Sequence, residues 1–328
     1  MNKSWNILIC DIVAPPAEIE GEVFGSAAHL WAPQAMKQSD ITDEQWQGAH
    51  AIIAYDRLRY DEALMSKLSS CKVIVRAGIG HDNIDKQAAK KHGIVVCNTP
   101  DYCTTEVADH TMALLLDLVR GVHQHASQVE DKIWQKDIPG AIRLEGRTFG
   151  CIGFGRIGQA TALRAKAFGM KVIYFDPFAK ANLSQEGIQK VDSLADIAKE
   201  SDIISLHTPL TPETQHIVGL DFLRKVRKGV IILNTARGGL IDIHALYQAM
   251  KSGQVEACGL DALPIERSDS SQQLVVDFEN HEPWLKWRLI ITPHVAYYSK
   301  EAMAELRRKS SMEAKRVLDN EQPKNRVG

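Results

Sequence analysis

The sequence predicts a two-domain α/β protein in which each domain is built on a doubly wound parallel sheet. Short apolar runs alternate with segments of helical periodicity over most of the 328 residues, which is typical of strand–helix–strand units. The chain is also longer than the size at which a single hydrophobic core usually stops growing. Ten predicted strands exceed one ordinary sheet, and they fall at residues 7–10, 51–55, 73–75, 94–96, 150–153, 171–175, 203–206, 230–233, 257–260 and 289–291.

A proline-containing loop at residues 98–101 predicts the boundary between the two domains. The apolar stripe that follows predicts a long helix near residues 105–120, which carries the chain into the second domain. A second amphipathic helix, at 301–318, is expected to return to the first domain and cover its sheet. Residues 1–100 plus 296–328 are therefore expected to form one domain, and residues 101–295 the other.

The segment at residues 268–287 is the least regular part of the sequence. It begins with a polar run and later contains Trp284 and Trp287. We interpret it as a long surface loop with two aromatic anchors.

Composition and charge narrow the class of partner. Hydrophobic residues make up 45% of the chain and charged residues 24%, with a formal net charge of −2, so no basic field is available to hold nucleic acid or an anionic membrane. No apolar run approaches the roughly 20 residues that span a bilayer, and the N-terminal segment lacks the pattern of a signal peptide. The six cysteines form no C-x-x-C pair, which favours free thiols and a cytoplasmic location. A small-molecule partner is expected.

A glycine-rich turn follows the predicted strand at 150–153 and opens a helix. Its G-x-G-x-x-G spacing needs one glycine for a tight turn, one for close backbone approach to a pyrophosphate, and one for helix packing. The helix N-terminus then offers N–H groups and partial positive charge to the anion. The residues are Gly153, Gly155, Arg156, Ile157 and Gly158.

Asp176 ends the next predicted strand, about 20 residues downstream, where a carboxylate accepts hydrogen bonds from an adenosine ribose. Its charge would repel a 2′-phosphate, so the expected cofactor is NAD. The alternative is a glycine-rich turn without a nucleotide, with Asp176 only ending its strand. We favour a Rossmann domain at residues 101–295 and expect a flavodoxin-like sheet in the other domain.

Unusual polar residues follow three later strands, at residues 234–239, 259–266 and 292–294. Ligands of open parallel sheets bind at the carboxyl edge of the strands. We therefore expect these three segments to face the cofactor.

The chain resembles the D-isomer-specific 2-hydroxyacid dehydrogenase family, and within it the branch of the C-terminal-binding proteins. The resemblance rests on blocks that follow the family order over nearly the whole chain: VRAGIGHDNID (75–85), PDYCTTEVADHT (100–111), GFGRIGQATALRAKAFG (153–169), LHTPLTPET (206–214), NTARGGLID (234–242) and TPHVAYYSKEA (292–302). It implies an NAD-dependent enzyme that transfers a hydride to or from a small 2-keto or 2-hydroxy acid of D configuration. It also implies a homodimer, with the helix near 105–120 in the interface.

The resemblance implies three catalytic residues. Arg237 matches the arginine whose planar fork binds the substrate and polarises its carbonyl. His294 matches the general acid–base residue, and Glu266 the carboxylate that orients the imidazole and favours its protonated form. The family pattern has a proline after this glutamate, whereas this chain has Arg267 and carries a Glu-Pro pair at 282–283. Glu266 keeps the expected spacing of five positions from Asp261.

The resemblance also assigns ligand contacts. The backbone of Gly78-Ile79-Gly80 matches a loop whose N–H groups hold the substrate carboxylate, and Tyr297 stands where the C-terminal-binding proteins carry tryptophan. Matching positions imply further contacts with the dinucleotide, from Val107, Thr208, Thr214, Thr235, Ala236 and Asp261.

Several other polar residues have a structural interpretation. His207 is expected to be a strand-end histidine satisfied by backbone groups. His123 and His125 lie two positions apart and do not share a helix face, so no metal site is predicted. Glu106 and His110 are interpreted as an interdomain polar pair.

A second function class remains open. The likeness to the C-terminal-binding proteins also permits an NAD(H)-sensing scaffold that recruits partners and retains only vestigial chemistry.

Overall fold

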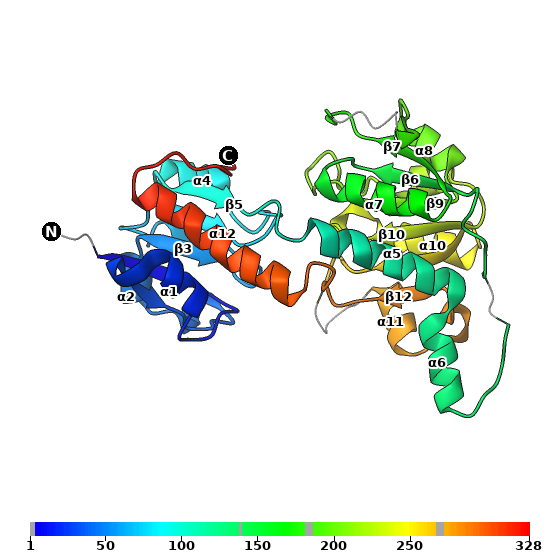
Figure 1. Ribbon diagram of the computed structural model, residues 1–328, viewed down its shortest axis with the longest axis horizontal. Helices are drawn as coiled ribbons and strands as arrows, with labels where there is room; N and C mark the ends of the chain where they lie inside the picture. The colour runs from blue at the N-terminus through cyan, green and yellow to red at the C-terminus, as the bar shows by residue number, and fades with distance from the viewer. Residues whose placement is uncertain (1–3, 138–139, 181–185, 267–271) are drawn as a thin grey trace. The chain divides into compact units, whose positions relative to one another are not determined.

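The computed structural model describes residues 4–137, 140–180, 186–266 and 272–328. The chain divides into two compact units. The first contains residues up to Tyr102 together with Ser299–Gly328, and the second runs from Cys103 to Tyr298 (Figure 1). The expected boundaries, after residues 100 and 295, lie within three residues of this division.

The first unit is built on a five-stranded parallel sheet in the order β2-β1-β3-β4-β5. This order is the flavodoxin-like arrangement expected from the sequence. The strands are β1 (Trp5–Ile9), β2 (Ala28–Trp31), β3 (Ala51–Ala54), β4 (Val73–Arg76) and β5 (Val95–Asn98). The helices are α1 (Glu18–Phe24), α2 (Asp43–Gly48), α3 (Glu62–Met65), α4 (Lys86–Lys91) and α12 (Lys300–Leu318), with 3-10 turns η1 (Gly25–Ala27) and η2 (Gln38–Asp40).

Helix α12 packs on β3, β4 and α1 of the first unit (Figure 1). The return of the C-terminal helix to this sheet, expected from its amphipathic pattern, is therefore confirmed. A partly buried ion pair joins the two helices on this face, because Arg307 of α12 donates to both carboxylate oxygens of the buried Glu20 in α1 at 2.6 and 2.8 Å. A core that includes Leu8, Trp46 and Ile74 packs under α2, α3 and α4.

The second unit is built on a seven-stranded parallel sheet in the order β12-β11-β10-β9-β6-β7-β8. Read from β8, this is the Rossmann order 3-2-1-4-5-6 with one more strand at the far edge. The strands are β6 (Thr148–Ile152), β7 (Lys171–Phe175), β8 (Ile188–Lys190), β9 (Ile203–Leu206), β10 (Val230–Asn234), β11 (Val255–Leu260) and β12 (Leu289–Ile291).

Helices cover both faces of this sheet. Along β10, Ile231 and Leu233 join a core that includes residues of α5 and α7, whereas Val230 and Ile232 join the core under α8 to α11. This alternation follows from the two-residue period of a strand and explains the continuous apolar runs in the sequence. The helices are α5 (Thr104–Arg120), α6 (Val122–Glu130), α7 (Arg156–Ala167), α8 (Leu194–Glu200), α9 (Leu220–Leu223), α10 (Ile243–Lys251) and α11 (Gln273–Glu279), with η4 (Gly238–Leu240) and η5 (Pro283–Leu285).

Two strands were missing from the sequence-based assignment, and both lie at a sheet edge. β2 is only partly buried over its four residues, and β8 buries Ile188 while exposing Gln189 and Lys190. An edge strand has one side open to water and needs no continuous apolar run. β2 and β8 therefore lack the apolar run by which the other ten strands, including the edge strands β5 and β12, were predicted.

The predicted surface loop at 268–287 was wrong for residues 273–279 and 283–285, whereas its two aromatic anchors are confirmed, since Trp287 is buried and Trp284 packs against the core. Residues 273–279 form α11, which buries Leu274 and Val275, and η5 follows at Pro283–Leu285. Asp277 of α11 connects this helix to η5 and to α10, because it accepts hydrogen bonds from Trp284 and Tyr247. The polar residues 268–271, on which the loop prediction depended, lie outside the described residues.

Candidate functional site

The glycine turn after β6 shows three different environments for its glycines. A Cβ at Gly153 would lie 2.6 Å from the backbone of His207, and Gly153 itself has φ +93°. A Cβ at Gly158 would lie 2.5 Å from the carbonyl oxygen of Gly153. At Gly155 a Cβ would meet nothing within 4 Å. Two glycines are therefore required by the protein's own packing, and the middle one borders open space.

That open space lies at the N-terminus of α7, where a pyrophosphate is expected. Gly155 is the N-cap of this 12-residue helix and makes no side-chain cap hydrogen bond, and Arg156 and Ile157 form its first turn. Backbone N–H groups at an uncapped N-terminus are available to an anion. The turn thus fits a dinucleotide, with Gly155 as the point of close backbone approach.

Asp176 follows β7 and is tied to the glycine turn. Its Oδ2 accepts from the backbone N–H of Phe154 at 2.8 Å, and its Oδ1 accepts from Phe178 N–H at the same distance. These two bonds fix the carboxylate beside the turn. Each oxygen keeps a second lone pair for another donor, so the predicted ribose contact remains chemically open.

Three neighbouring strands of the second unit are each followed, at their carboxyl ends, by one of the predicted catalytic residues: Arg237, Glu266 and His294. Arg237 comes after β10, Glu266 after β11 and His294 after β12, and β11 pairs in parallel with both of the others. Because parallel strands place their carboxyl ends together, the topology delivers all three residues to the same edge of the second unit.

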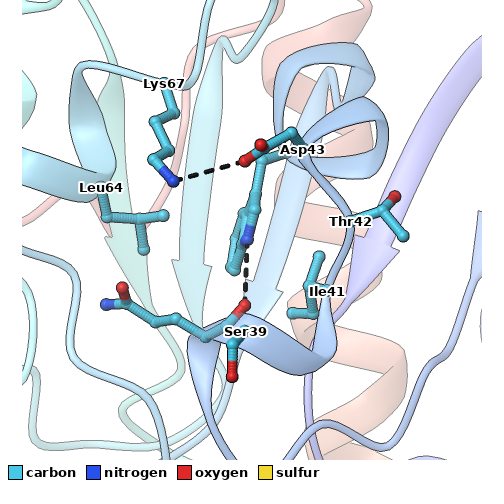
Figure 2. A pocket seen from close by; sticks show the side chains of 8 residues that line it. Ser39, Ile41, Thr42, Asp43, Leu64 and Lys67 are labelled. Carbon is cyan, nitrogen blue, oxygen red and sulfur yellow. Dashed lines mark hydrogen bonds and ion pairs between the residues drawn. The ribbon is translucent and has the colours of Figure 1, made fainter.

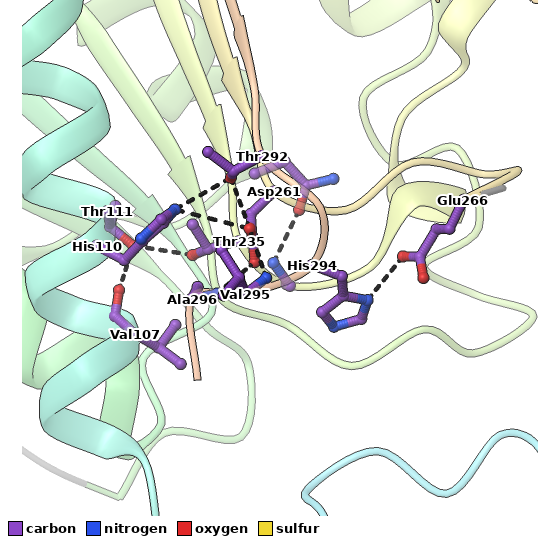
Figure 3. A network of polar contacts seen from close by, with 12 residues as sticks. Val107, His110, Thr111, Thr235, Asp261, Glu266, Thr292, His294, Val295 and Ala296 are labelled. Carbon is purple, nitrogen blue, oxygen red and sulfur yellow. Dashed lines mark hydrogen bonds and ion pairs between the residues drawn. The ribbon is translucent and has the colours of Figure 1, made fainter. Parts of the chain in front are cut away.

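His294 and Glu266 form a hydrogen-bonded pair. The distance from His294 Nδ1 to Glu266 Oε1 is 2.7 Å (Figure 3). A carboxylate only accepts, so Nδ1 carries the hydrogen and Nε2 is left to exchange a proton. The side chains are 30% and 39% exposed, which leaves the ring open to a ligand. Arg267, the departure from the family pattern, lies outside the described residues.

The Arg237 loop is held by hydrogen bonds of Asn234 and by close packing at Gly238. Asn234 receives a hydrogen bond from Ala236 N–H and donates one to the carbonyl of Arg237, at 3.0 and 2.9 Å. A Cβ at Gly238 would lie 1.9 Å from the carbonyl carbon of Leu263. Only glycine allows this approach, and it brings the Arg237 loop against the segment that leads to Glu266.

The predicted cofactor contacts near α5 belong to a buried polar network. Thr235 is buried, and its hydroxyl lies 2.8 Å from that of Thr111. Thr111 in turn donates to the carbonyl oxygen of Val107 at 2.8 Å (Figure 3). Val107 and Thr235 thus lie in one connected cluster.

Thr208 and Thr214 belong to the loop after β9. The Thr214 hydroxyl donates to the carbonyl of Pro209 and accepts from Thr211 N–H, both at 2.7 Å. These bonds close its own loop. Thr208 N lies 2.7 Å from the Cβ position at Gly153, so this residue borders the glycine turn.

Asp261, at the end of β11, is 2% exposed. Its Oδ1 accepts from Thr292 Oγ1 at 2.6 Å and from Val295 N–H at 2.9 Å, and its Oδ2 accepts from Ala296 N–H at 2.9 Å. The carboxylate expected to contact the dinucleotide is therefore engaged with the loop that carries His294.

The Gly78-Ile79-Gly80 loop lies in the first unit, after β4. Gly78 has φ +150°, and a Cβ there would collide with the Arg76 guanidinium. Its carbonyl accepts from Thr99 N–H at 3.0 Å, and Asn98 donates to the Ile79 carbonyl at 2.8 Å. The carbonyls are thereby bonded within the unit. Tyr297 lies in the second unit, with its ring centroid 6.3 Å from that of His294.

The remaining histidines have partners of their own. His207 Nε2 lies 2.9 Å from the hydroxyl of Ser205, so its side chain is satisfied by that residue and not by backbone. Burial lowers the pKa of His207 to about 4. His123 pairs with Asp117. Among the described residues, no group of three or more His, Cys, Asp or Glu side chains is arranged to hold a metal ion.

His110 makes contacts that the sequence did not predict. Its Nε2 lies 3.1 Å from Thr292 Oγ1 and 3.6 Å from Asp261 Oδ1, both within the second unit, and the expected pairing with Glu106 stays a prediction. Sequence reasoning missed this cluster because its members are up to 182 positions apart. The only local signal was the position of Thr292 two residues before His294.

A surface pocket of about 540 Å³ lies elsewhere in the first unit, between η2, α2 and α3. Trp46 is one of its lining residues. An ion pair of 3.3 Å joins two others, Lys67 and Asp43 (Figure 2). None of the predicted site residues lines this pocket. In the part of the chain that the structure covers, no helix is long and apolar enough to cross a membrane.

Comparisons with known proteins agree with this architecture. Residues 112–296 match the family described as "D-isomer specific 2-hydroxyacid dehydrogenase, NAD binding domain". A hydroxypyruvate reductase from Thermotoga maritima is 43% identical over 232 residues, which cover 70% of this chain and 72% of that protein. A D-3-phosphoglycerate dehydrogenase from Methanocaldococcus jannaschii is 36% identical over 285 residues. That match covers 87% of this chain, which spans about half, 52%, of the relative's length.

A solved structure is similar over nearly the whole chain. The D-lactate dehydrogenase from Aquifex aeolicus, complexed with NAD and lactic acid, gives a TM-score of 0.88 at 30% identity and covers 98% of this chain and 99% of its own. The NAD-binding assignment of the second unit and the two-domain α/β fold therefore agree with the expectation from sequence.

Proposed function

Because this chain belongs to the D-isomer-specific 2-hydroxyacid dehydrogenase family, we propose that it interconverts a small 2-keto acid and the corresponding D-2-hydroxy acid with NAD(H). The observation that carries the proposal is the 2.7 Å His294–Glu266 pair at the sheet edge where Arg237 also lies. The family expected from sequence is confirmed, while the branch of the C-terminal-binding proteins is not distinguished by these relatives. The named relatives are dehydrogenases and reductases, which favours the enzyme over the scaffold.

The second unit would hold the cofactor through its glycine turn. The first turn of α7 would present N–H groups to the pyrophosphate over the open face of Gly155, and Asp176 would accept from the ribose. Since a carboxylate at that position repels a 2′-phosphate, NAD is preferred to NADP. The nicotinamide supplies or accepts the hydride at the substrate's α-carbon.

Arg237 and His294 would act on the substrate carbonyl. The Arg237 guanidinium binds the acid through directed, charge-assisted hydrogen bonds and stabilises negative charge as it develops on the carbonyl oxygen. His294 Nε2 delivers a proton to that oxygen during reduction and removes it from the hydroxyl during oxidation. Glu266 holds the ring by its Nδ1 hydrogen and thereby leaves Nε2 for proton transfer.

The substrate's remaining contacts follow the sequence predictions. The backbone N–H groups of Gly78-Ile79-Gly80 would bind the substrate carboxylate, and Tyr297 would contact its side chain. Val107, Thr208, Thr214, Thr235 and Ala236 remain proposed cofactor contacts.

A substrate panel tests the proposal. Purified protein is mixed with NADH or NADPH and with glyoxylate, hydroxypyruvate, pyruvate, or branched and aromatic 2-keto acids. We expect loss of nicotinamide absorbance with NADH in preference to NADPH, and a product of D configuration by chiral chromatography. Absence of turnover with every acid, despite measured NADH binding, would contradict the proposal.

A homodimer is part of the proposed function. Three apolar side chains in the residues that follow α5 are exposed to solvent: Trp134 is 81% exposed, Val122 64% and Val129 53%. Exposed apolar clusters of this kind favour a protein interface. Sedimentation of the wild type and of Trp134→Glu tests this, since loss of the dimer is expected only in the variant. A monomeric wild type would refute it.

We also propose a cytoplasmic location. All six cysteines are free and buried, which is typical of proteins in a reducing compartment. Fractionation of cells that produce the tagged protein provides the test.

A further inference from the structure

The carboxylate of Asp261 is hydrogen-bonded to the loop that carries His294. It accepts three hydrogen bonds, from the Thr292 hydroxyl and from the backbone N–H groups of Val295 and Ala296 (Figure 3). The donors stand on both sides of His294 in the sequence. A single buried side chain therefore fixes the backbone before and after the proposed acid–base residue.

His294 needs such an anchor because its backbone is in an unfavourable conformation. Its φ is +53°, in the left-handed region that residues other than glycine rarely adopt. A conformation of this kind persists only where the surroundings hold it in place. The Asp261 bonds lie immediately around this residue and supply that restraint.

The directions of the hydrogen bonds extend the anchor to helix α5. Thr292 has one hydroxyl hydrogen, and it is donated to Asp261 because a carboxylate only accepts. His110 Nε2, 3.1 Å from Thr292 Oγ1, must then be the donor to Thr292. The resulting chain runs from His110 through Thr292 to Asp261.

We propose that Asp261 is a positioning residue, which sets His294 against Glu266 through the backbone of residues 292–296, and that Thr292 with His110 supports it. This inference rests on the proposed function and differs from the dinucleotide contact that sequence resemblance assigns to Asp261. A cofactor contact would act on NADH affinity. A positioning residue acts on turnover and on the His294–Glu266 hydrogen bond.

The main test is Asp261→Asn, which keeps the shape of the side chain. Asparagine retains one acceptor oxygen and places an NH₂ group against a donor of the loop, so the backbone around His294 loses part of its restraint. We expect kcat to fall about 100-fold, as for small displacements of a catalytic group. The Kd for NADH, measured by fluorescence, should stay within about twofold of the wild-type value, because a positioning residue makes no contact with NADH. Loss of a real contact would raise Kd by more than this, since a twofold change corresponds to only RT ln 2 of binding free energy.

Asp277→Asn is the matched control. Asp277 is also a buried carboxylate of the second unit, and it accepts hydrogen bonds from Gln273, Tyr247 and Trp284. Its partners lie in α10, α11 and η5, away from the His294 loop. This variant should lose thermal stability comparably and keep kcat.

Thr292→Val provides a graded second variant. It removes the bonds to Asp261 and His110 but preserves both backbone N–H bonds, so kcat should fall about 10-fold, the equivalent of one hydrogen bond. If Asp261→Asn does not fold, this variant carries the test. An unchanged kcat in folded Thr292→Val would then overturn the proposal.

A readout independent of activity separates this inference from the proposed function. Histidine-selective ¹⁵N NMR detects the Nδ1 hydrogen bond between His294 and Glu266, with Glu266→Gln assigning the signal. We expect the signal in the wild type and Asp277→Asn, and its loss in Asp261→Asn. If the wild type turns over no 2-keto acid, the proposed function fails, and the NMR result still decides the role of Asp261.

Two further results, both measured on Asp261→Asn, would overturn the positioning role. One is an intact His294–Glu266 signal in folded Asp261→Asn. The other is a weakened Kd for NADH with kcat unchanged, which would instead make Asp261 a cofactor contact.

Discussion

Two histidines of the second unit stand at the ends of parallel strands, and their surroundings differ. His207 follows β9, is held by the Ser205 hydroxyl, and has its pKa lowered to about 4 by burial. His294 follows β12, is bonded to the carboxylate of Glu266, and keeps a ring that is 30% exposed. The partner and the access of the ring, more than the residue type, separate a structural histidine from one suited to proton transfer.

The largest expected effect is the difference in kcat between variants of these two histidines. His294→Ala should lower kcat for 2-keto acid reduction about 1000-fold, because the proton donor is lost. His207→Asn, which preserves a polar group beside Ser205, should change kcat by less than about threefold because it removes no transferred proton. Steady-state kinetics of both variants measure the difference. Equal losses would show that strand-end position alone decides the role.

Arg237→Lys comes next. We expect kcat/KM to fall about 100-fold, because an ammonium retains the charge but loses the planar fork that binds a carboxylate or carbonyl oxygen. NADH affinity should be unchanged, since the proposed role is toward the substrate. A variant that retains wild-type kcat/KM would place Arg237 outside the site.

Glu266→Gln sharpens the comparison by making the partner of His294 neutral, as the partner of His207 already is. Reduction should slow about 30-fold at neutral pH, less than the roughly 100-fold or more that an acid–base residue itself contributes, because the imidazole remains. A kcat equal to that of the wild type would argue against the pair.

The smallest effect concerns stability. His207 has a folded pKa of about 4, below the unfolded value near 6.5, so its contribution is complete above pH 6.5 and is lost as pH falls toward 4. Between pH 7.5 and 5.5 the wild type should lose roughly 1 kcal/mol of unfolding free energy from this group. Urea unfolding of His207→Asn should show that much less pH dependence. An identical dependence in both proteins would contradict the buried, neutral ring.

The sequence predicted most strands because burial on both faces leaves continuous apolar runs. β6 and β10 carry such runs and were predicted, and so do the edge strands β5 and β12. The edge strands β2 and β8 carry no such run and were missed. α11 was missed for a related reason. It is a short helix whose buried Leu274 and Val275 follow a polar segment, and its packing partners come from distant parts of the chain.

What the sequence determined by itself was local chemistry: the glycines at a turn that packs against His207, the acidic residue at the end of the next strand, and the residue types of the proposed site. What only the tertiary structure decided was which of these side chains meet. In the structure His294 is bonded to Glu266 and not to Glu282, Asp261 is bonded to the loop around His294, and His110 is bonded to Thr292. The physical reason is that spacing along the chain fixes only near neighbours, whereas the order of strands in the sheet brings distant loops to one edge.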